Sequence, residues 1–579
     1  MSGRRPTGGA PSGPATGPDE RARTRATIVV VDSDPDGRER VVDELTRRYA
    51  GDCDIVCCAE AGNAPAELEA LRDAGVPVAL VLVAALPPDG GRELLARAAA
   101  AHPTSRRALL VDFGDWGNPE IASEIRRAMA DGHADYYVIK PWRRGEELFH
   151  RTVSEFLYEC SRTGVYGGQL EFVVVAERWS SRGHEIRHLL ARNGVPHVFH
   201  EAGSSQAVEL LDGHTPHGDD RPVVLTMAGE LLVDPTDEEL ARHYGVTTAL
   251  DRPRAVDVAV VGAGPGGLAA AIAAAAEGLS VLVLERTGIG GQAAGSSLIR
   301  NYLGFPRGVS GSELAQRAYQ QAWAFGVDVV HMREAVGLRA VDGRYVVDID
   351  GCPQVTATAV LLATGVAYRR LDTPALEALI GRGVYYGAAI SEARSLAGGD
   401  VVVVGGGNAA GQAALHLARS ARHVTIVTRK DGLSASMSSY LRQQIERSGT
   451  ISVRSDCRLV DGGGDQHLEW LALDDGTVER VPADAVFLFL GGEPRTDWLP
   501  PFVARDAKGF ILTGAEVPSN ASPPGHAPSM FETSAPGVFA VGDVRSGSIK
   551  RVASAAGEGS VVVPYVIARV ASVSPEVVR

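Results

Sequence analysis

The chain has 579 residues, 45% of them hydrophobic and 22% charged, which predicts a soluble globular protein of three or four domains. Its net charge of −14 disfavours nucleic-acid binding and binding to anionic membranes, because both present phosphate groups. The longest apolar run, residues 78–86, is too short to cross a bilayer, so we expect no membrane segment. Six scattered cysteines without a Cys-x-x-Cys pair are typical of the reducing cytoplasm.

Residues 1–26 are rich in Gly, Pro, Ser and Thr, which predicts a disordered tail. The tail has no apolar core segment, so it does not read as a secretory signal. We therefore expect the first folded domain to begin at about Thr27.

Residues 27–160 alternate short apolar runs with helical patterns, which predicts a parallel, doubly wound sheet. The arrangement resembles the flavodoxin-like fold of response-regulator receiver domains. In this resemblance Asp32 and Asp34 stand at the acidic-pair position, and Lys140-Pro141 stands at the family's Lys-Pro position. The phospho-accepting aspartate of that family is missing, because the third strand ends in Val83-Ala84-Ala85. Without this carboxylate no aspartyl phosphate can form. We predict a pseudo-receiver for docking or dimerisation, with the two aspartates as solvated turn acids rather than Mg²⁺ ligands.

Residues 170–248 follow a loose linker and read as strand, loop, helix, strand, then a hairpin and a short helix. This order resembles a thioredoxin or glutaredoxin domain, with Pro222 at that family's cis-proline position. The family's cysteine motif is replaced by Arg-Trp-Ser-Ser-Arg-Gly-His-Glu, residues 178–185. A hydroxyl without an adjacent base is a poor nucleophile, so we predict that Ser180 and Ser181 serve binding or packing.

The segment from residue 255 carries a dinucleotide-binding pattern. An apolar strand leads into Gly262-x-Gly264-x-x-Gly267, a helix that begins near Pro265, a second strand and Glu285. The glycines allow a tight turn, close approach of a pyrophosphate, and close packing of helix on strand. An acid at the end of the second strand binds ribose hydroxyls, which favours an unphosphorylated adenosine such as that of FAD.

The pattern recurs 143 residues later (405 − 262). Gly405, Gly407, Asn408 and Ala410 form the second turn, and the strand that follows ends in Thr428-Arg429-Lys430 instead of an acid. Cations at this position fit a ribose 2′-phosphate, so Arg429 and Lys430 favour NADPH over NADH. A further basic residue expected nearby is replaced by Ser434, which weakens this preference.

Two nucleotide folds, the second inserted in the first, resemble the thioredoxin-reductase type of flavoprotein. The resemblance rests on Gly-Gly-Gln and Asn-Tyr-x-Gly-Phe-Pro within 288–306, Ala-Thr-Gly at 363–365, and the second flavin fingerprint at 533–559. It implies an FAD-binding domain at 255–372 and 494–579, and an NAD(P)H-binding domain at 373–493. Besides the glycine turns and Glu285, it implies flavin contacts from Gly291, Gln292, Asn301, Ala363, Thr364, Gly365, Gly542, Asp543, Lys550, Arg551 and Val552.

The resemblance also places Gly387 and Ile390 where the family has its redox cysteines, and Ser391 where it has an acid. Disulfide exchange requires a thiolate, so these residues cannot perform it.

We therefore predict a multidomain α/β oxidoreductase that is cytoplasmic and forms a homodimer. It passes hydride from NADPH to FAD and on to a small-molecule or protein acceptor. Tyr385 and Tyr386 either wall this site or pack within their strand. We assign no catalytic side chain and no metal. Two alternatives stay open: a redox-responsive regulatory flavoprotein that senses NADPH, and a flavin oxidase of a small-molecule pathway.

Overall fold

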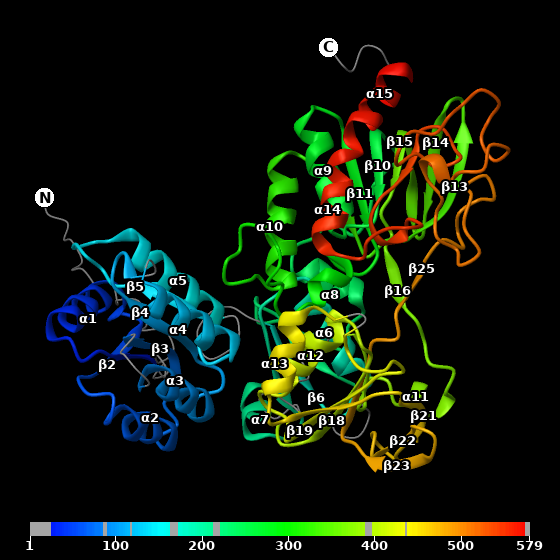
Figure 1. The fold of residues 1–579 in the computed structure, drawn as a ribbon. Helices are drawn as coiled ribbons and strands as arrows, with labels where there is room; N and C mark the ends of the chain where they lie inside the picture. Colours follow the sequence, from blue (N-terminus) through cyan, green and yellow to red (C-terminus); the bar gives the residue numbers. More distant parts are fainter. Residues whose placement is uncertain are drawn as a thin grey trace, which may run out of the picture. The chain divides into compact units, whose positions relative to one another are not determined.

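The computed structural model describes residues 25–84, 90–115, 118–161, 172–211, 221–387, 396–434 and 437–573 (Figure 1). Residues 1–24 of the predicted tail and residues 162–171 around the predicted linker lie outside these ranges, as do Ala388 to Ser391 of the family's cysteine segment. The chain forms two compact units, residues 1–169 and residues 170–579, each with its own cores.

The first unit is a five-stranded parallel sheet in the order β2-β1-β3-β4-β5, the order of flavodoxin-like sheets. Helices α1 and α5 bury one face and α2, α3 and α4 bury the other, because each strand is apolar on both sides. The strands are β1 (Ala26–Val31), β2 (Cys53–Cys58), β3 (Val78–Ala84), β4 (Arg106–Val111) and β5 (Tyr136–Ile139); the helices are α1 (Pro35–Tyr49), α2 (Ala64–Asp73), α3 (Gly90–Ala101), α4 (Pro119–Ala130) and α5 (Glu147–Ser161).

The acidic pair of the first unit differs from the prediction. Asp32 is buried, and its carboxylate forms an ion pair with the Lys140 ammonium at 2.9 Å. Asp34 is exposed and caps α1 by accepting the N–H of Gly37 at 2.8 Å. The expectation of a solvated turn acid is therefore wrong for Asp32, because Lys140 arrives from the end of β5, a contact that the local sequence does not reveal.

The second unit begins with a four-stranded sheet in the order β7-β6-β8-β9, in which β6 and β7 are parallel and the other pairs antiparallel. Helices α6 and α8 cover one face and α7 covers the other. The elements are β6 (Phe172–Ala176), α6 (Ser181–Arg192), β7 (His197–Glu201), α7 (Ser205–Leu210), β8 (Val223–Leu225), β9 (Leu231–Val233) and α8 (Asp237–His243). We call residues 172–211 and 221–250 the small-sheet module; its kinship with thioredoxin domains stays a prediction.

A seven-stranded sheet follows, in which the parallel strands β12-β11-β10-β15 run from one edge, β26 is parallel to β15, and β14 and β13 form an antiparallel extension. Helices α9, α10 and α14 stand side by side against it (Figure 1). Its elements are β10 (Arg254–Val261), α9 (Pro265–Ala276), β11 (Val281–Glu285), η2 (Gly291–Gly295), α10 (Gly311–Ala324), β12 (Asp328–His331), β13 (Ala335–Val341), β14 (Arg344–Ile349), β15 (Cys352–Leu362), η4 (Gly514–Glu516), β26 (Val538–Ala540), η5 (Gly542–Val544), α14 (Val552–Val561) and α15 (Val563–Val573).

A second parallel sheet, in the order β17-β24-β18-β19-β20, is inserted between β15 and β26 and carries a small antiparallel sheet, β21-β22-β23. The two-stranded ribbon β16-β25 carries the chain into this insertion and back (Figure 1). The elements are β16 (Val366–Tyr368), α11 (Pro374–Glu377), β17 (Val384–Tyr386), β18 (Asp400–Val404), α12 (Asn408–Leu417), β19 (His423–Val427), α13 (Ser439–Arg447), β20 (Ile451–Arg454), β21 (Arg458–Gly463), β22 (Trp470–Asp474), β23 (Val478–Pro482), β24 (Ala485–Leu488) and β25 (Gly492–Pro494). Two nested Rossmann-like sheets are thus present.

Within the described residues one helical stretch, Val552–Val573, is long and apolar enough to cross a membrane by length and composition. Several of its valines, among them Val562, Val566 and Val570, are buried in the core of the seven-stranded sheet. Of the most apolar window of this stretch, 28% is buried, and the expectation that the chain has no membrane segment stays a prediction.

Candidate functional site

The first glycine turn joins β10 to α9, and each glycine has a distinct steric reason. Gly262 has φ +107°, and a Cβ there would lie 2.4 Å from the carbonyl oxygen of Ala363. A Cβ on Gly267 would lie 1.9 Å from the carbonyl oxygen of Gly262. By contrast, no heavy atom of the described residues comes within 4 Å of a Cβ on Gly264, apart from its own chain neighbours. Two glycines therefore serve close packing, and the third leaves open space where a pyrophosphate would approach.

Glu285, the predicted ribose ligand, lies at the end of β11 and is buried. One carboxylate oxygen accepts the N–H of Ala263 at 2.8 Å, and the other accepts those of Thr287 and Gly288 at 2.8 and 3.0 Å. The acid thereby connects the glycine turn with the loop that follows β11. The Thr287 hydroxyl also donates to the second oxygen, Oε1, at 3.2 Å, so Oε1 is fully used, and Oε2, which accepts only the Ala263 N–H among the described residues, is the oxygen left for a ribose hydroxyl.

The helix N-termini at the predicted nucleotide sites lack side-chain caps. Gly264 precedes α9, Gly407 precedes α12 and Arg551 precedes α14, and none of them provides a side-chain cap within the described part of the chain. In the same unit Ser180, Thr236 and Ser310 cap α6, α8 and α10. Uncapped N–H groups carry partial positive charge and bind anions, which fits phosphates and an electron-rich flavin.

The end of β26 and the start of α14 bring the second flavin fingerprint to the glycine turn. Gly559 of α14 lies so close to α9 that a Cβ would approach the Gly266 carbonyl oxygen to 2.2 Å. Lys550 donates to the backbone carbonyl of Asp543 at 2.8 Å. Burial raises the pKa of Asp543, and the charge of Lys550 opposes this shift. Gly542 and Val552, the first residue of α14, thus lie near the start of α9, together with the other flavin contacts that the sequence predicts for this fingerprint.

The remaining predicted flavin residues lie near the ribbon. Gln292 in η2 donates to the carbonyl of Val366 in β16. Thr364 lies between Ala363 and Gly365, directly before β16, and its hydroxyl is 3.5 Å from the carbonyl of Arg495. A Cβ on Gly291 would stand 3.3 Å from the Gly264 Cα, so these turns meet. Asn301 is exposed on the loop after η2, and its contact with flavin stays a prediction.

The second glycine turn repeats this construction between β18 and α12. Gly405 has φ +148° and abuts Phe489, whereas a Cβ on Gly407 would meet no heavy atom of the described residues within 4 Å beyond its chain neighbours. Ala410 replaces the third glycine and is fully buried. Asn408 accepts the N–H of Ser438 at 2.7 Å, a role the sequence did not reveal. Arg429 and Lys430 are exposed after β19 and Thr428 is buried.

Gly387, which the resemblance places at the family's first redox-cysteine position, has φ +76°. A Cβ there would lie 2.4 Å from the hydroxyl oxygen of Tyr368 on β16. A cysteine is therefore disfavoured by both backbone and space in this arrangement. Tyr385, one of the two aromatics left open by the sequence, is buried in strand packing against Phe487.

Sequence reasoning did not find three further residues near these turns. Glu558 accepts the N–H of Gly542 at 2.7 Å and binds Arg545 at 2.7 Å. His331 pairs in register with Glu285 and is buried; within the described residues neither ring nitrogen has a hydrogen-bond partner. Burial lowers the pKa of His331 to about 4, and the charge of Glu285 opposes this shift. The third is Tyr368. No local motif marks any of them.

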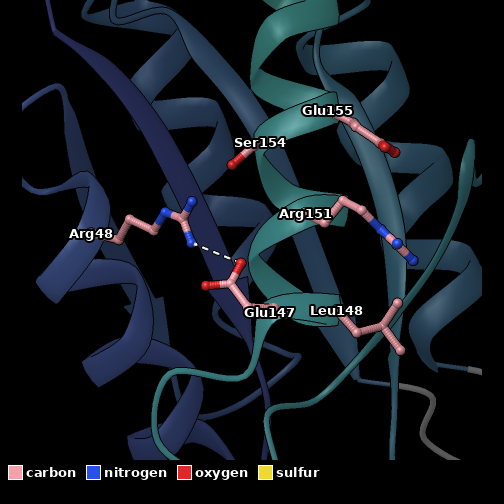
Figure 2. Close-up of a pocket in the computed structure, with 6 residues that line it drawn as sticks. All are labelled: Arg48, Glu147, Leu148, Arg151, Ser154 and Glu155. Atoms are coloured by element: carbon pink, nitrogen blue, oxygen red, sulfur yellow. Dashed lines mark ion pairs between the residues drawn. The ribbon is translucent and has the colours of Figure 1, made fainter.

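A pocket of about 600 Å³ lies on the first unit, lined by Arg48, Glu147, Leu148, Arg151, Ser154 and Glu155 (Figure 2). Its side chains come from α1 and α5, and Arg48 pairs with Glu147 at 3.6 Å. None of the residues predicted to bind a cofactor lines it. The pocket is open and is bordered by paired charges. We therefore assign the candidate site to the glycine turns and not to this pocket.

The two glycine turns, the acid after β11 and the uncapped helices fit a bound dinucleotide at each Rossmann-like sheet. Two nucleotide sites of this kind are typical of oxidoreductases that use a flavin and a pyridine nucleotide. FAD supplies the hydride-accepting chemistry when it is bound.

The model of the pyridine nucleotide-disulphide oxidoreductase family matches residues 256–559, so the chain belongs to that family. The thioredoxin reductase of Treponema pallidum (strain Nichols) is 33% identical over 307 residues, which are 52% of this chain and 94% of the relative. A 34.2 kDa protein in the rubredoxin operon of Clostridium pasteurianum is 30% identical over 309 residues, 53% of this chain and 94% of that protein. The chain is thus a thioredoxin-reductase-like flavoprotein over its C-terminal part.

The crystal structure of Lactococcus lactis thioredoxin reductase in the FR conformation superposes with a TM-score of 0.50 at 25% identity. The aligned part comprises 55% of this chain and 99% of the Lactococcus lactis chain. The family match, residues 256–559, includes the strands of both Rossmann-like sheets, and members of this family bind FAD and NADPH.

Proposed function

We propose that the protein oxidises NADPH and passes the electrons through FAD to an external acceptor, without an internal dithiol. The observation that carries this proposal is that the two glycine turns each leave open space at Gly264 and Gly407, while Gly387, which the resemblance places at the family's cysteine position, has no room for a side chain. All six cysteines are free thiols, and the second unit contains only Cys352 and Cys457. These two lie on different sheets, Cys352 at the start of β15 and Cys457 before β21.

The overall reaction balances as NADPH, one proton and an oxidised two-electron acceptor giving NADP⁺ and the reduced acceptor. The residues of this chain bind and orient the two nucleotides and hold them apart from water. Arg429 and Lys430 are exposed after β19, where a 2′-phosphate would be recognised, and this supports NADPH over NADH.

An anaerobic titration with NADPH tests the proposal. We expect the flavin absorbance of the purified protein to bleach on addition of NADPH, and a panel of small disulfides, quinones and ferredoxins to reoxidise it. The matched variant replaces all six cysteines, and it should bleach and cycle like the parent protein. A variant that folds and holds flavin but no longer cycles would show that sulfur on this chain carries the electrons.

The N-terminal parts support a second candidate, a regulatory flavoprotein. We propose that the first unit is a receiver-like docking domain, because its strand order is flavodoxin-like and Asp32 is held by Lys140. The small-sheet module contacts both nucleotide-binding parts: Ser181 donates to the Ile380 carbonyl at 2.8 Å, and Asn193 lies 3.5 Å from the Thr287 carbonyl. If NADPH reduces the flavin but no acceptor sustains turnover, this candidate is favoured.

A further inference from the structure

The loop around Glu285 has two flanking segments. Through its carboxylate, Glu285 holds residues 286–288 by the N–H groups of Thr287 and Gly288. Through its backbone carbonyl, it accepts the N–H of Arg333 at 3.1 Å and so holds the segment 331–333. These two segments border the end of the sheet where the acid is predicted to bind the adenosine ribose of FAD. Their positions therefore set the shape of the adenosine end of the flavin site.

The small-sheet module contacts the first of these segments with the end of α6. Asn193 is buried, and its amide lies 3.5 Å from the Thr287 carbonyl while it donates to the Leu189 carbonyl at 2.9 Å. A Cβ on Gly288 would stand 3.0 Å from the amide nitrogen of Asn193, so the loop fits the module closely. Gln316 of α10 donates to the Asn193 carbonyl and holds this end of α6 against the flavin domain.

The module contacts the second segment with α8 and the chain that follows it. The carbonyl of Thr247 accepts the N–H of His331 at 2.8 Å. The carbonyl of Thr248 accepts a guanidinium N–H of Arg333 at 2.6 Å, and Glu238 pairs with the same guanidinium at 2.8 Å. The Arg333 side chain is 14% exposed and the Glu238 side chain is 39% exposed, so this ion pair lies at the edge of the module and is only partly shielded from water.

One polar side chain at this place, His331, lacks the partners that a closed site would give it. His331 is buried beside Glu285, and in the described residues neither of its ring nitrogens is hydrogen-bonded. The charge of Arg192, the last residue of α6, interacts with Glu285 and Arg286. A buried imidazole without partners costs free energy, and an adenosine with hydroxyls and ring nitrogens would satisfy it.

From these contacts we infer that the small-sheet module forms one wall of the adenosine end of the FAD site, so that FAD binding and docking of the module stabilise each other. Such coupling is reciprocal: FAD must tighten the docking by the same factor by which docking tightens FAD. The inference requires FAD binding but not the proposed acceptor or the preference for NADPH. Failure of the acceptor panel would therefore leave it intact.

Hydrogen exchange of the full-length protein, with FAD removed and then restored, tests the coupling directly. We expect amides in residues 186–194 and 238–248 to exchange on the order of tenfold more slowly with FAD bound. Residues 205–211 of α7, which belong to the same module but cover the other face of its sheet, serve as the internal control and should not change. Exchange at 186–194 and 238–248 that is the same with and without FAD overturns the inference.

A second measurement uses Asn193 and Glu238, two module residues whose side chains contact the flanking segments. The double variant Asn193→Ala with Glu238→Ala should weaken FAD binding on the order of tenfold, measured as the dissociation constant from flavin fluorescence. The control Arg182→Gln lies on the same helix, but its partners Glu185, Pro235 and Asp237 all belong to the module. An FAD affinity reduced equally in the control and the double variant would overturn the inference, because it would report general damage to the module. If the double variant does not fold, the exchange experiment on the unaltered chain decides.

Discussion

The substitution Gly264→Ala separates the folding of the first glycine turn from its binding of a nucleotide. Gly264 has φ −69° and ψ 176°, a conformation that alanine adopts without strain. In the described structure its Cβ would stand in open space. We therefore expect the apoprotein to be unchanged or stabilised by about 0.4–1 kcal/mol, because alanine reduces the freedom of the unfolded chain.

FAD binding should respond in the opposite direction. The added methyl group holds the pyrophosphate away from the N-terminus of α9, which costs at least one hydrogen bond to a charged group, about 1.5–3 kcal/mol. This corresponds to an FAD dissociation constant about 10- to 150-fold higher. Gly267→Ala is the contrasting variant: its Cβ would lie 1.9 Å from the Gly262 carbonyl oxygen, so we expect loss of folding stability itself.

The assay is reconstitution of the apoprotein with FAD, followed by flavin fluorescence, with the unfolding of the apoprotein measured in parallel. Gly407→Ala provides the matched control, since it should leave FAD binding intact and impair only reduction by NADPH. Unchanged FAD affinity in Gly264→Ala would refute the assignment of this turn to a pyrophosphate. An unfolded Gly264→Ala apoprotein would refute the steric reasoning.

Three further outcomes are expected. Replacing Arg429 and Lys430 by serine should lower kcat/KM for NADPH about 10- to 150-fold, because a hydrogen bond to a charged group is lost, and should leave kcat/KM for NADH nearly unchanged. Equal losses with the two nucleotides would contradict the assignment of these residues to the 2′-phosphate. Replacing Cys352 and Cys457 by alanine should leave the rate of flavin reduction by NADPH unchanged in stopped-flow measurements. Burial raises the pKa of Glu44, but hydrogen bonds from His150, Gly145 and Arg47 outweigh it and lower the value from 4.5 to about 2. Glu44 thus stabilises the first unit by about 3 kcal/mol above pH 4.5, and this stability is lost as the pH falls towards 2. At pH 7 the variant Glu44→Gln should lack this stability, measured by amide exchange in α1 and α5. A loss of stability in Glu44→Gln that is the same at all pH values would contradict the reasoning.

The glycine turns were predictable from the sequence because their constraints are local. Gly262 needs a positive φ and Gly267 needs contact with a carbonyl only five residues away, so spacing alone carries the information. The order of strands and helices was predictable for the same reason, since periodicity and turn residues mark each element. The nested arrangement followed from the return of flavin motifs after the second turn.

Contacts between distant segments were not predictable in this way. Asp32 reads as a turn acid, and only the approach of Lys140 makes it a buried ion pair. Tyr368 shares no motif with Gly387, although its hydroxyl fills the space where a cysteine side chain would begin. The contact of Asn193 with Thr287 joins residues 94 positions apart. No periodicity or motif reports such a pairing, because it depends on how separately folded sheets pack.

The helix N-termini give a reason why FAD should stabilise the second unit as well as serve its chemistry. Buried or partly buried N–H groups at a helix start need acceptors, and Ser180, Thr236 and Ser310 supply them for α6, α8 and α10. The helices α11 and α13, which also lie outside the nucleotide turns, have no side-chain cap among the described residues. Gly264 and Arg551 supply no side-chain acceptor for α9 and α14, and the close contact of these two helices brings both starts to one region. A bound pyrophosphate and flavin carbonyl are acceptors of the required kind. A ligand that binds only the folded state stabilises it by RT ln(1 + L/Kd), where L is the free ligand concentration, so we expect this unit to be less stable when the site is empty.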